Sequence, residues 1–198
     1  MGFVTNRLDS PLYIVQLPNM SDEEKKLIKE AKKGSENAFG VLYTTFLSRI
    51  YRYILSYVYD SHIAEDLTQE TFLKAWKYLP KYSTKKGTFQ AFLYRIARNI
   101  SIDHQRKRKH KVLNIEFGEN VTTGEDFEEK LIADEKIKKV HEALSGLKEL
   151  ERQLVILRFF EELPFAEIAK IVGKREGAVR VKTFRAIKKL KDIYTKNE

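Results

Sequence analysis

The residues of this chain that could take part in chemistry are mostly cations and aromatics, not nucleophiles or metal ligands. Of its 198 residues, 37 are Lys or Arg and 28 are Asp or Glu, which gives a formal net charge of +9. Cysteine is absent, the four histidines are scattered, and the sequence has no Gly-rich phosphate-binding loop. A basic protein of this kind favours a polyanionic partner such as nucleic acid. We therefore predict a binding protein, not an enzyme, with no metal site and no cofactor.

A basic stripe accompanied by aromatic side chains lies in the middle of the chain. A helix is predicted over 88–105. A basic stripe on this helix and just beyond it, away from its apolar face, comprises Arg95, Arg98, Arg106 and Lys109. Aromatics such as Trp76 and Tyr82 lie close to this stripe in the sequence. Single-stranded nucleic acid binds to cationic grooves with aromatic platforms, because every base has a face that can stack. The alternative interpretation is a solvated helix surface with ordinary core aromatics beside it.

The C-terminal part has the spacing of a helix-turn-helix. A short apolar helix is predicted over 165–172, and Ala169 precedes Gly173 by four residues. The small Ala lets two helices cross closely, and Gly allows the sharp turn between them. A second helix over 175–194 carries many Lys and Arg residues and fits the DNA major groove. A plain helical hairpin with a solvated basic face is the alternative.

A polar cluster, formed by Asp66, Gln69 and Glu70, lies on one side of a helix predicted over 63–79. Taken alone, this cluster is most simply a solvated helix surface.

The elements that position these residues are helices almost throughout, so we predict an all-α protein. Ser35 and Asp60-Ser61 are predicted to cap two of the helices. The only candidate strand covers 112–117. From 116 to 135 there are eight acidic residues and one Lys, a composition typical of an extended linker. The predicted organisation is as follows: an N-terminal extension at 1–20, a helical domain at 21–106, a flexible acidic linker at 107–128 and a helix-turn-helix domain at 129–198.

Membrane insertion is not expected from this sequence. An uninterrupted apolar run of about 18 residues, which a spanning helix needs, does not occur. Residues 1–20 lack the basic segment and apolar core of a signal peptide. We therefore expect a cytoplasmic protein.

Three segments together resemble bacterial RNA polymerase sigma factors of the extracytoplasmic-function (ECF) group. The first runs from Ala64 to Trp76, and the second, Gly87–Asp103, is similar to the promoter-opening segment of that family. The third comprises Leu157–Phe160, Glu167–Ala169 and Glu176–Arg180 in the C-terminal part. The resemblance covers about 21–195. Two departures are that Phe92 stands where the family usually has Trp, and that Lys148 stands where Pro is common.

The resemblance implies a transcription initiation factor that binds core RNA polymerase and recognises the −35 and −10 elements of promoters. It assigns polymerase binding to Asp66, Gln69 and Glu70. It assigns −10 recognition and strand opening, with one base flipped into a pocket, to Lys81, Tyr82, Lys85, Lys86, Arg95, Arg98, Asn99 and Arg106. It assigns duplex −35 recognition to Arg152, Arg175, Glu176, Arg180, Lys182, Phe184 and Arg185. It also implies an anti-sigma factor as a partner, and we expect a monomer when the protein is free.

Two alternatives remain at this point. A free-standing helix-turn-helix regulator would bind duplex DNA without polymerase, generally as a dimer on paired half-sites. An interaction protein could bind polymerase without directing initiation, and it would not need Arg180 or Arg185. The polar cluster Asp66, Gln69 and Glu70 separates the first alternative from a sigma factor, because a regulator has no use for it.

Overall fold

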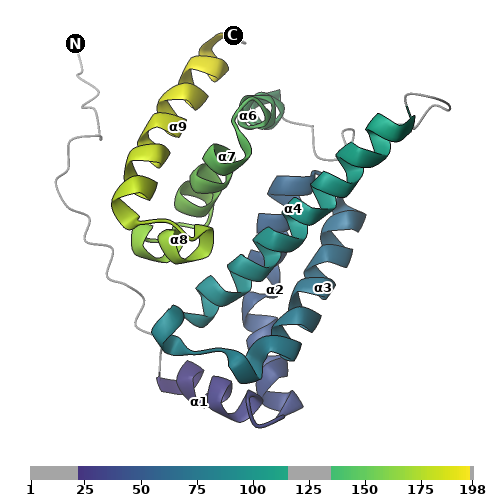
Figure 1. Ribbon diagram of the computed structural model, residues 1–198, viewed down its shortest axis with the longest axis vertical. Coiled ribbons are helices and arrows are strands. Elements are labelled where there is room, and N and C mark those ends of the chain that lie inside the picture. The colour runs from purple at the N-terminus through teal and green to yellow at the C-terminus, as the bar shows by residue number, and fades with distance from the viewer. Residues whose placement is uncertain (1–21, 116–134, 197–198) are drawn as a thin grey trace.

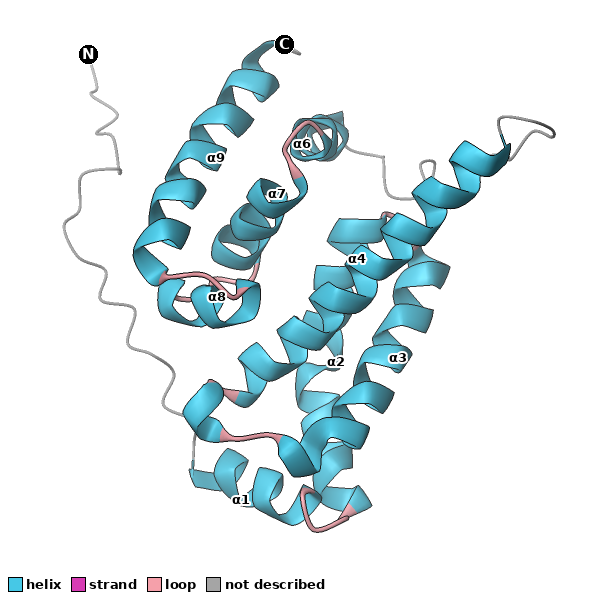
Figure 2. Ribbon diagram, viewed as in Figure 1, coloured by secondary structure: helices cyan, strands magenta, loops and turns pink. Residues whose placement is uncertain are grey.

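The computed structural model describes residues 22–115 and 135–196. Within these two ranges the chain forms helices and connecting turns, and no strand is present (Figure 2). The all-α fold class is therefore confirmed. The N-terminal extension, Ser21 and most of the predicted acidic linker lie outside the described residues.

The first domain consists of four helices joined by short connections. They are α1 (Asp22–Ala31), α2 (Glu36–Val58), α3 (Ser61–Tyr78) and α4 (Phe89–Ile115). Helices α2, α3 and α4 pack side by side, and α1 crosses one end of this bundle (Figure 1). Apolar residues that recur every three or four positions give these helices a continuous buried face.

Local capping signals fix where two of these helices begin. The Ser35 hydroxyl accepts a hydrogen bond from the Ala38 amide at 3.2 Å, and α2 starts at the next residue. The Asp60 carboxylate accepts one from the Ile63 amide at 2.9 Å and starts α3. Each cap satisfies an amide that has no partner inside its own helix. Both caps were predicted from sequence and are confirmed.

The core of the first domain is built around large aromatic side chains. Tyr53, Tyr94 and Phe89 are fully buried. The rings of Tyr53 and Tyr94 meet edge-on with centroids 5.2 Å apart, and Phe46 meets Phe89 in the same way at 5.6 Å. Edge-to-face contacts of this kind are favoured by the charge distribution of aromatic rings. They hold α4 in a fixed position against α2.

Helix α4 is longer than the sequence pattern predicts. It continues to Ile115 instead of ending near residue 105. Residues 107–115, the first part of the predicted linker, are therefore helical. Half of the residues from 106 to 115 are Lys or Arg, which are good helix formers, and the stretch includes no Gly or Pro. The part of the candidate strand 112–117 that is described, up to Ile115, is helical as well.

The second domain contains α6 (Glu135–Ser145), α7 (Glu149–Val155), α8 (Phe165–Val172) and α9 (Glu176–Lys196), with a π-helical turn η4 (Ile156–Phe160) after α7. Helix α9 packs against α6 and α7 around a small core that includes Leu144, Leu147, Val155 and Ala186. At the start of α7 the Glu151 carboxylate accepts a hydrogen bond from the Lys148 amide at 3.1 Å. The helix therefore starts normally although Lys148 replaces a common Pro.

The two domains are in contact. Helix α8 lies against the first half of α4, as Figure 1 shows. Buried side chains of the second domain, including Leu154, Leu157 and Ile168, belong to the same apolar core as the first domain. Burying this surface stabilises the packed arrangement, since apolar burial contributes about 25 cal/mol per Å².

Candidate nucleic-acid and protein interfaces

A pocket lies between the α3–α4 connection and the first turns of α4. Two short 3-10 turns, η1 (Leu79–Lys81) and η2 (Thr84–Lys86), form the connection. The pocket has a volume of about 170 Å³ and is lined by Tyr78, Lys81, Tyr82, Ser83, Gly87, Thr88, Phe92 and Arg95. A cavity of about 150 Å³ is large enough to admit a benzene ring. The space is therefore on the scale of one base ring, with aromatic and cationic walls.

Tyr82 and Gly87 give this pocket its shape. The Tyr82 hydroxyl donates a hydrogen bond to the Gly87 carbonyl at 3.0 Å, and burial raises the pKa of Tyr82 to about 12. The hydroxyl therefore stays protonated and remains a donor at neutral pH. Gly87 has a φ of +135°, a conformation that residues with a Cβ rarely adopt, and a Cβ there would lie 3.1 Å from the Lys170 side chain.

The residues predicted for −10 binding gather around this pocket and along α4. Lys81, Tyr82 and Arg95 line the pocket itself, and Lys85 is exposed in η2. Asn99 and Arg106 lie further along α4, and both are exposed. The Lys86 side chain lies outside the described part of the structure. The remaining member of the set, Arg98, contacts the second domain.

A second basic groove continues from the pocket, and sequence reasoning missed it. It has a volume of about 330 Å³ and is lined by Lys25, Ile28, Lys29, Lys32, Tyr82, Ser83 and Thr84. The Lys32 ammonium donates a hydrogen bond to the Tyr82 carbonyl at 2.8 Å. The spacing of Lys25, Lys29 and Lys32 places them on one face of α1. That spacing was visible in the sequence, but only the fold brings α1 beside the loop.

The predicted polymerase-binding cluster lies on the outer side of α3. Asp66 and Gln69 are accessible to solvent, whereas Glu70 forms an ion pair with Lys74 at 2.7 Å. Gln69 also borders an apolar groove of about 520 Å³ between α2 and α3. The sequence analysis missed Leu73, which lines this groove and is 70% exposed. Its position, four residues after Gln69 and three after Glu70, places Leu73 on the same helix face as the polar cluster, and this spacing could have identified it.

The helix-turn-helix forms as predicted. Gly173 has a φ of +68°, and its amide donates to the Ala169 carbonyl to close α8. Val179 is fully buried and anchors the first turns of α9. The outward face of α9 and the residue before it present Arg175, Glu176, Arg180, Lys182, Phe184 and Arg185, all of them exposed.

Contacts within the motif orient two of these side chains. Arg180 donates to the Glu176 carboxylate at 2.9 Å, and its guanidinium lies 4.9 Å from the centre of the Phe165 ring. The arginine is therefore preorganised at the start of α9, the end that a recognition helix presents to base edges. Phe184 is 76% exposed.

Arg152 lies apart from the other residues predicted for −35 binding. Its guanidinium lies 4.8 Å from the centre of the Tyr57 ring and donates to the Gln105 side chain at 3.4 Å. Both of those residues belong to the first domain. In this arrangement Arg152 lies at the contact between domains, so its assignment to a DNA phosphate stays a prediction.

Comparison with known proteins connects these surfaces with one family. Residues 42–111 match the family model "Sigma-70 region 2", and residues 137–190 match "Sigma-70, region 4". The ECF RNA polymerase sigma factor SigM of Bacillus subtilis is 30% identical over 159 residues, which is 78% of this chain and 94% of SigM. The chain belongs to the ECF sigma factors.

Other similar proteins agree with this assignment. The ECF RNA polymerase sigma factor BldN of Streptomyces coelicolor is 33% identical over 174 residues, which is 83% of this chain. The chain spans 63% of the length of BldN. Among solved structures, CnrH in complex with the cytosolic domain of CnrY has a TM-score of 0.70 at 22% identity, covering 89% of this chain and all of CnrH. RpoE of Bartonella quintana, in complex with the anti-sigma factor NepR, has a TM-score of 0.64 at 21% identity, covering 79% of this chain and 96% of RpoE. At these identities the structures show a shared fold.

Metal-binding clusters and helices that could span a membrane are both absent from the described part of this ECF sigma factor. Among residues 22–115 and 135–196, no group of three or more His, Asp or Glu could hold a metal ion. None of the helices in the same ranges is both long and apolar enough to cross a membrane.

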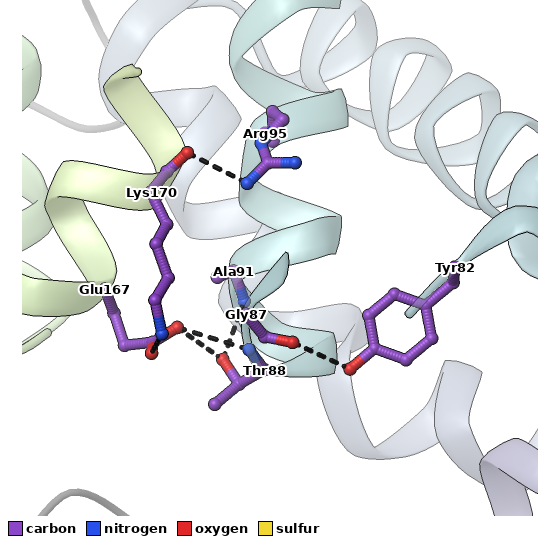
Figure 3. Close-up of polar contacts among 7 residues, drawn as sticks. All are labelled: Tyr82, Gly87, Thr88, Ala91, Arg95, Glu167 and Lys170. Carbon is purple, nitrogen blue, oxygen red and sulfur yellow. Dashed lines mark hydrogen bonds and ion pairs between the residues drawn. The ribbon is translucent and has the colours of Figure 1, made fainter. Parts of the chain in front are cut away.

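In this sigma factor, polar side chains of the second domain contact the start of α4. The Glu167 carboxylate accepts hydrogen bonds from the Thr88 hydroxyl at 2.7 Å and from the Thr88 amide at 3.4 Å (Figure 3). Arg95 donates to the Lys170 carbonyl at 2.9 Å, and Lys170 forms an ion pair with Glu167 at 2.8 Å. A carboxylate at a helix N-terminus is stabilised by the free amides and the helix dipole.

Further along the contact, Gln153 and Glu161 join the second domain to the first. Gln153 is fully buried; it accepts from Arg98 at 2.7 Å and donates to the Tyr57 hydroxyl at 3.1 Å. The Tyr94 hydroxyl donates a short hydrogen bond to the Glu161 carboxylate. These side chains were not singled out from sequence, because the residues in contact are 55 or more positions apart.

The two carboxyl groups at this contact have opposite pKa shifts. Burial raises the pKa of Glu161, and the Tyr94 hydroxyl, Arg52 and Arg49 only partly oppose it. Burial also acts to raise the pKa of Glu167, but hydrogen bonds from Lys170 and Thr88 outweigh it and hold the pKa below its usual value. Glu167 is therefore ionised at neutral pH, as an anion at a helix N-terminus should be.

Proposed function

We propose that this sigma factor binds core RNA polymerase through the outer side of α3 and reads promoter DNA at two separate places. The first domain takes the −10 strand and the helix-turn-helix takes the −35 duplex. The observation that carries the −10 assignment is the pocket between the α3–α4 connection and α4. It combines aromatic walls, a lysine and an arginine on one face, which is what an unstacked base and its backbone need.

The polymerase surface consists of Asp66 and Gln69 together with the exposed Leu73. A protein interface of good affinity combines an apolar anchor with polar groups that fix orientation. Glu70 contributes its carboxylate although it is paired with Lys74, because an exposed ion pair is worth only about 0–1 kcal/mol and exchanges partners readily. The apolar groove beside Gln69 is the place for a side chain of the polymerase.

The −35 surface is the exposed face of α9. Arg180 and Arg185 have the donor geometry for guanine edges or phosphates, and Arg175 and Lys182 add charge for the backbone. Glu176 can accept from a cytosine amino group once Arg180 turns towards the DNA. Phe184 supplies apolar contact with thymine methyl groups.

The remaining assignments follow from this role. The protein acts in the cytoplasm as an initiation factor without catalytic activity of its own, and core polymerase carries out the chemistry. An anti-sigma factor is its expected regulator, as in the RpoE–NepR complex.

Core polymerase binding tests this function. Asp66→Ala combined with Gln69→Ala should weaken binding of the purified chain to bacterial core enzyme at least about tenfold, or about 1.4 kcal/mol. Retention on immobilised core enzyme across a concentration series measures the affinity. Glu30→Ala combined with Asn37→Ala, which changes exposed residues of the same domain, should bind like the wild type.

The outcome separates the proposed function from its rival. If the wild type does not bind core enzyme yet shifts duplex DNA by itself, the chain is a free-standing regulator. If all three proteins bind equally well, the polymerase surface lies elsewhere than on α3.

A further inference from the structure

The arrangement of the two domains conflicts with the −10 function of the first. Arg95 and Arg98 are the cations of α4 nearest the pocket that were assigned to the DNA strand. Both donate hydrogen bonds to the second domain, Arg95 to the Lys170 carbonyl and Arg98 to Gln153. A strand leaving the pocket along this face of α4 would meet α8 and α7 in its path.

Glu167 occupies the position that suits a phosphate group. Its carboxylate accepts from the Thr88 amide and hydroxyl at the start of α4, directly beside the pocket (Figure 3). Phosphates bind at helix N-termini, where the helix dipole and nearby backbone and hydroxyl donors favour an anion. The second domain therefore places an anion of its own where the strand backbone would supply one.

The close fit at Gly87 shows that this contact is tightly packed. A Cβ at Gly87 would approach the Lys170 side chain to 3.1 Å. Beyond the polar contacts, Leu154, Leu157 and Ile168 share one apolar core with the first domain. The contact thus combines apolar burial with hydrogen bonds to charged groups, which strengthen one another where water is excluded.

The DNA-reading face of α9 takes no part in this contact. Arg175, Lys182, Phe184 and Arg185 are all exposed in the same arrangement. The packed form thus occupies Arg95 and Arg98 at the strand site and leaves the face of α9 accessible.

We propose that the structure is a closed state in which the second domain acts as an internal competitor for the −10 strand. The proposal rests on the proposed function, because it takes the pocket and α4 as the strand site. In the closed state the chain can bind duplex DNA through α9 but cannot bind the −10 strand. Separation of the two domains uncovers the strand site.

The test compares an opened variant with a matched control. Glu161→Arg places a cation next to Arg49 and Arg52, whose charges now face the Glu161 carboxylate, and should separate the domains. Glu162→Arg makes the same charge change at the neighbouring exposed position. Because the chain has no cysteine, Lys77→Cys in α3 and Lys191→Cys in α9 provide a single pair of sites for fluorescent labels.

Two measurements are made on the full chain. Energy transfer between the labels should give one narrow distance distribution for the wild type and for Glu162→Arg, and a shifted, broader distribution for Glu161→Arg. A fluorescein-labelled single strand of mixed sequence, about 12 nucleotides long, reports the strand site. When less than about a tenth of the wild-type molecules are in the open form, opening raises the apparent affinity at least about tenfold. Glu161→Arg should therefore bind this strand at least about tenfold more tightly than the wild type or Glu162→Arg.

A second variant guards against simple misfolding. Gln153→Ala removes the partner of Arg98 and Tyr57 without changing the net charge, and it should shift both readouts in the same direction. Circular dichroism confirms that each variant keeps its helix content. Binding of a mixed-sequence duplex of equal length should be the same for Glu161→Arg and Glu162→Arg.

Equal single-strand affinity for Glu161→Arg and Glu162→Arg, or a broad distance distribution in the wild type, would overturn the closed state. Core polymerase binding by the wild type remains a separate readout of the proposed function. A chain that opens as described but never binds core enzyme would refute the sigma-factor role and leave the domain contact standing.

Discussion

Glu161 and Gln153 show how much depends on single polar side chains at the domain contact. Gln153 is fully buried and satisfied on both sides, by Arg98 and by Tyr57. Glu161 accepts a hydrogen bond from Tyr94 and has two arginines within electrostatic reach, and burial still raises its pKa. A buried amide with both partners in place stabilises the contact, whereas a partly buried carboxylate is compensated only in part.

The pKa shift of Glu161 has a defined consequence for stability. Its folded-state pKa is raised above the ordinary 4.5, so the folded chain holds its proton more tightly than the unfolded chain. The stability gained in this way is complete below pH 4.5 and is lost as the pH rises through the raised folded-state value.

Glu161→Gln should therefore be more stable than the wild type at neutral pH. The amide has no charge to desolvate, and its oxygen can still accept from Tyr94. The difference should shrink as the pH falls from about 7 to about 4, where the wild-type carboxyl becomes protonated in the folded state. Urea unfolding of both proteins across this range measures it.

Glu167 does not disturb this comparison, although its lowered pKa gives the opposite pH dependence. Its stabilisation is present above pH 4.5 and is lost as the pH falls through its folded-state value, and it is common to both proteins. A wild type more stable than Glu161→Gln at neutral pH would show that the charged carboxylate is favoured at this site.

At the scale of elements, most helices and their starts were predictable because those signals are local. Ser35 and Asp60 act on amides three residues away, and the turn at Gly173 depends on one backbone conformation. The end of α4 was missed because the charged stretch after residue 105 suited a helix as well as a linker. The groove beside Leu73 and the lysine groove on α1 needed packing between helices, which local spacing cannot supply.

Two glycines of the helix-turn-helix should respond in opposite ways to alanine. Gly173 has a φ of +68°, and no atom lies within 4 Å of the place that a Cβ would take, so Gly173→Ala incurs backbone strain alone. We expect a loss of about 1–2 kcal/mol in unfolding free energy. Gly177 lies in the first turns of α9 with equally open surroundings, and Gly177→Ala should gain about 0.5–1 kcal/mol.

Urea unfolding of the full chain checks both changes against the wild type. Because neither Cβ meets a neighbour, packing cannot explain a difference in sign between the two variants. A Gly173→Ala protein as stable as the wild type would mean that the turn relaxes to another conformation, and the described geometry of the motif would be wrong.

At the scale of the whole molecule, the contact between domains is the feature that sequence reasoning did not find. Two helical regions with an acidic segment between them form a pattern that predicts independent domains. The bonds that join the domains, such as Thr88 to Glu167 and Arg98 to Gln153, link residues that carry no mutual signal along the chain. The guanidinium of Arg152, whose assignment to DNA stays a prediction, lies over the Tyr57 ring of the first domain.

The two proposed DNA surfaces differ in their accessibility in this arrangement. The basic face of α9 is exposed, whereas Arg95 and Arg98 of α4 are bonded to the second domain. In the proposed closed state, promoter recognition therefore has two steps. Opening must precede strand capture, and the conformation that core polymerase binds should be the open one.

Transcription initiation by the purified chain with bacterial core RNA polymerase is the most direct test of this function. A library of fragments from the source genome is transcribed with and without the protein, and the RNA 5′ ends are mapped. We expect new start sites that depend on the protein and lie at a fixed distance downstream of a shared two-block sequence. Start sites identical to those of core enzyme alone would contradict the sigma-factor function.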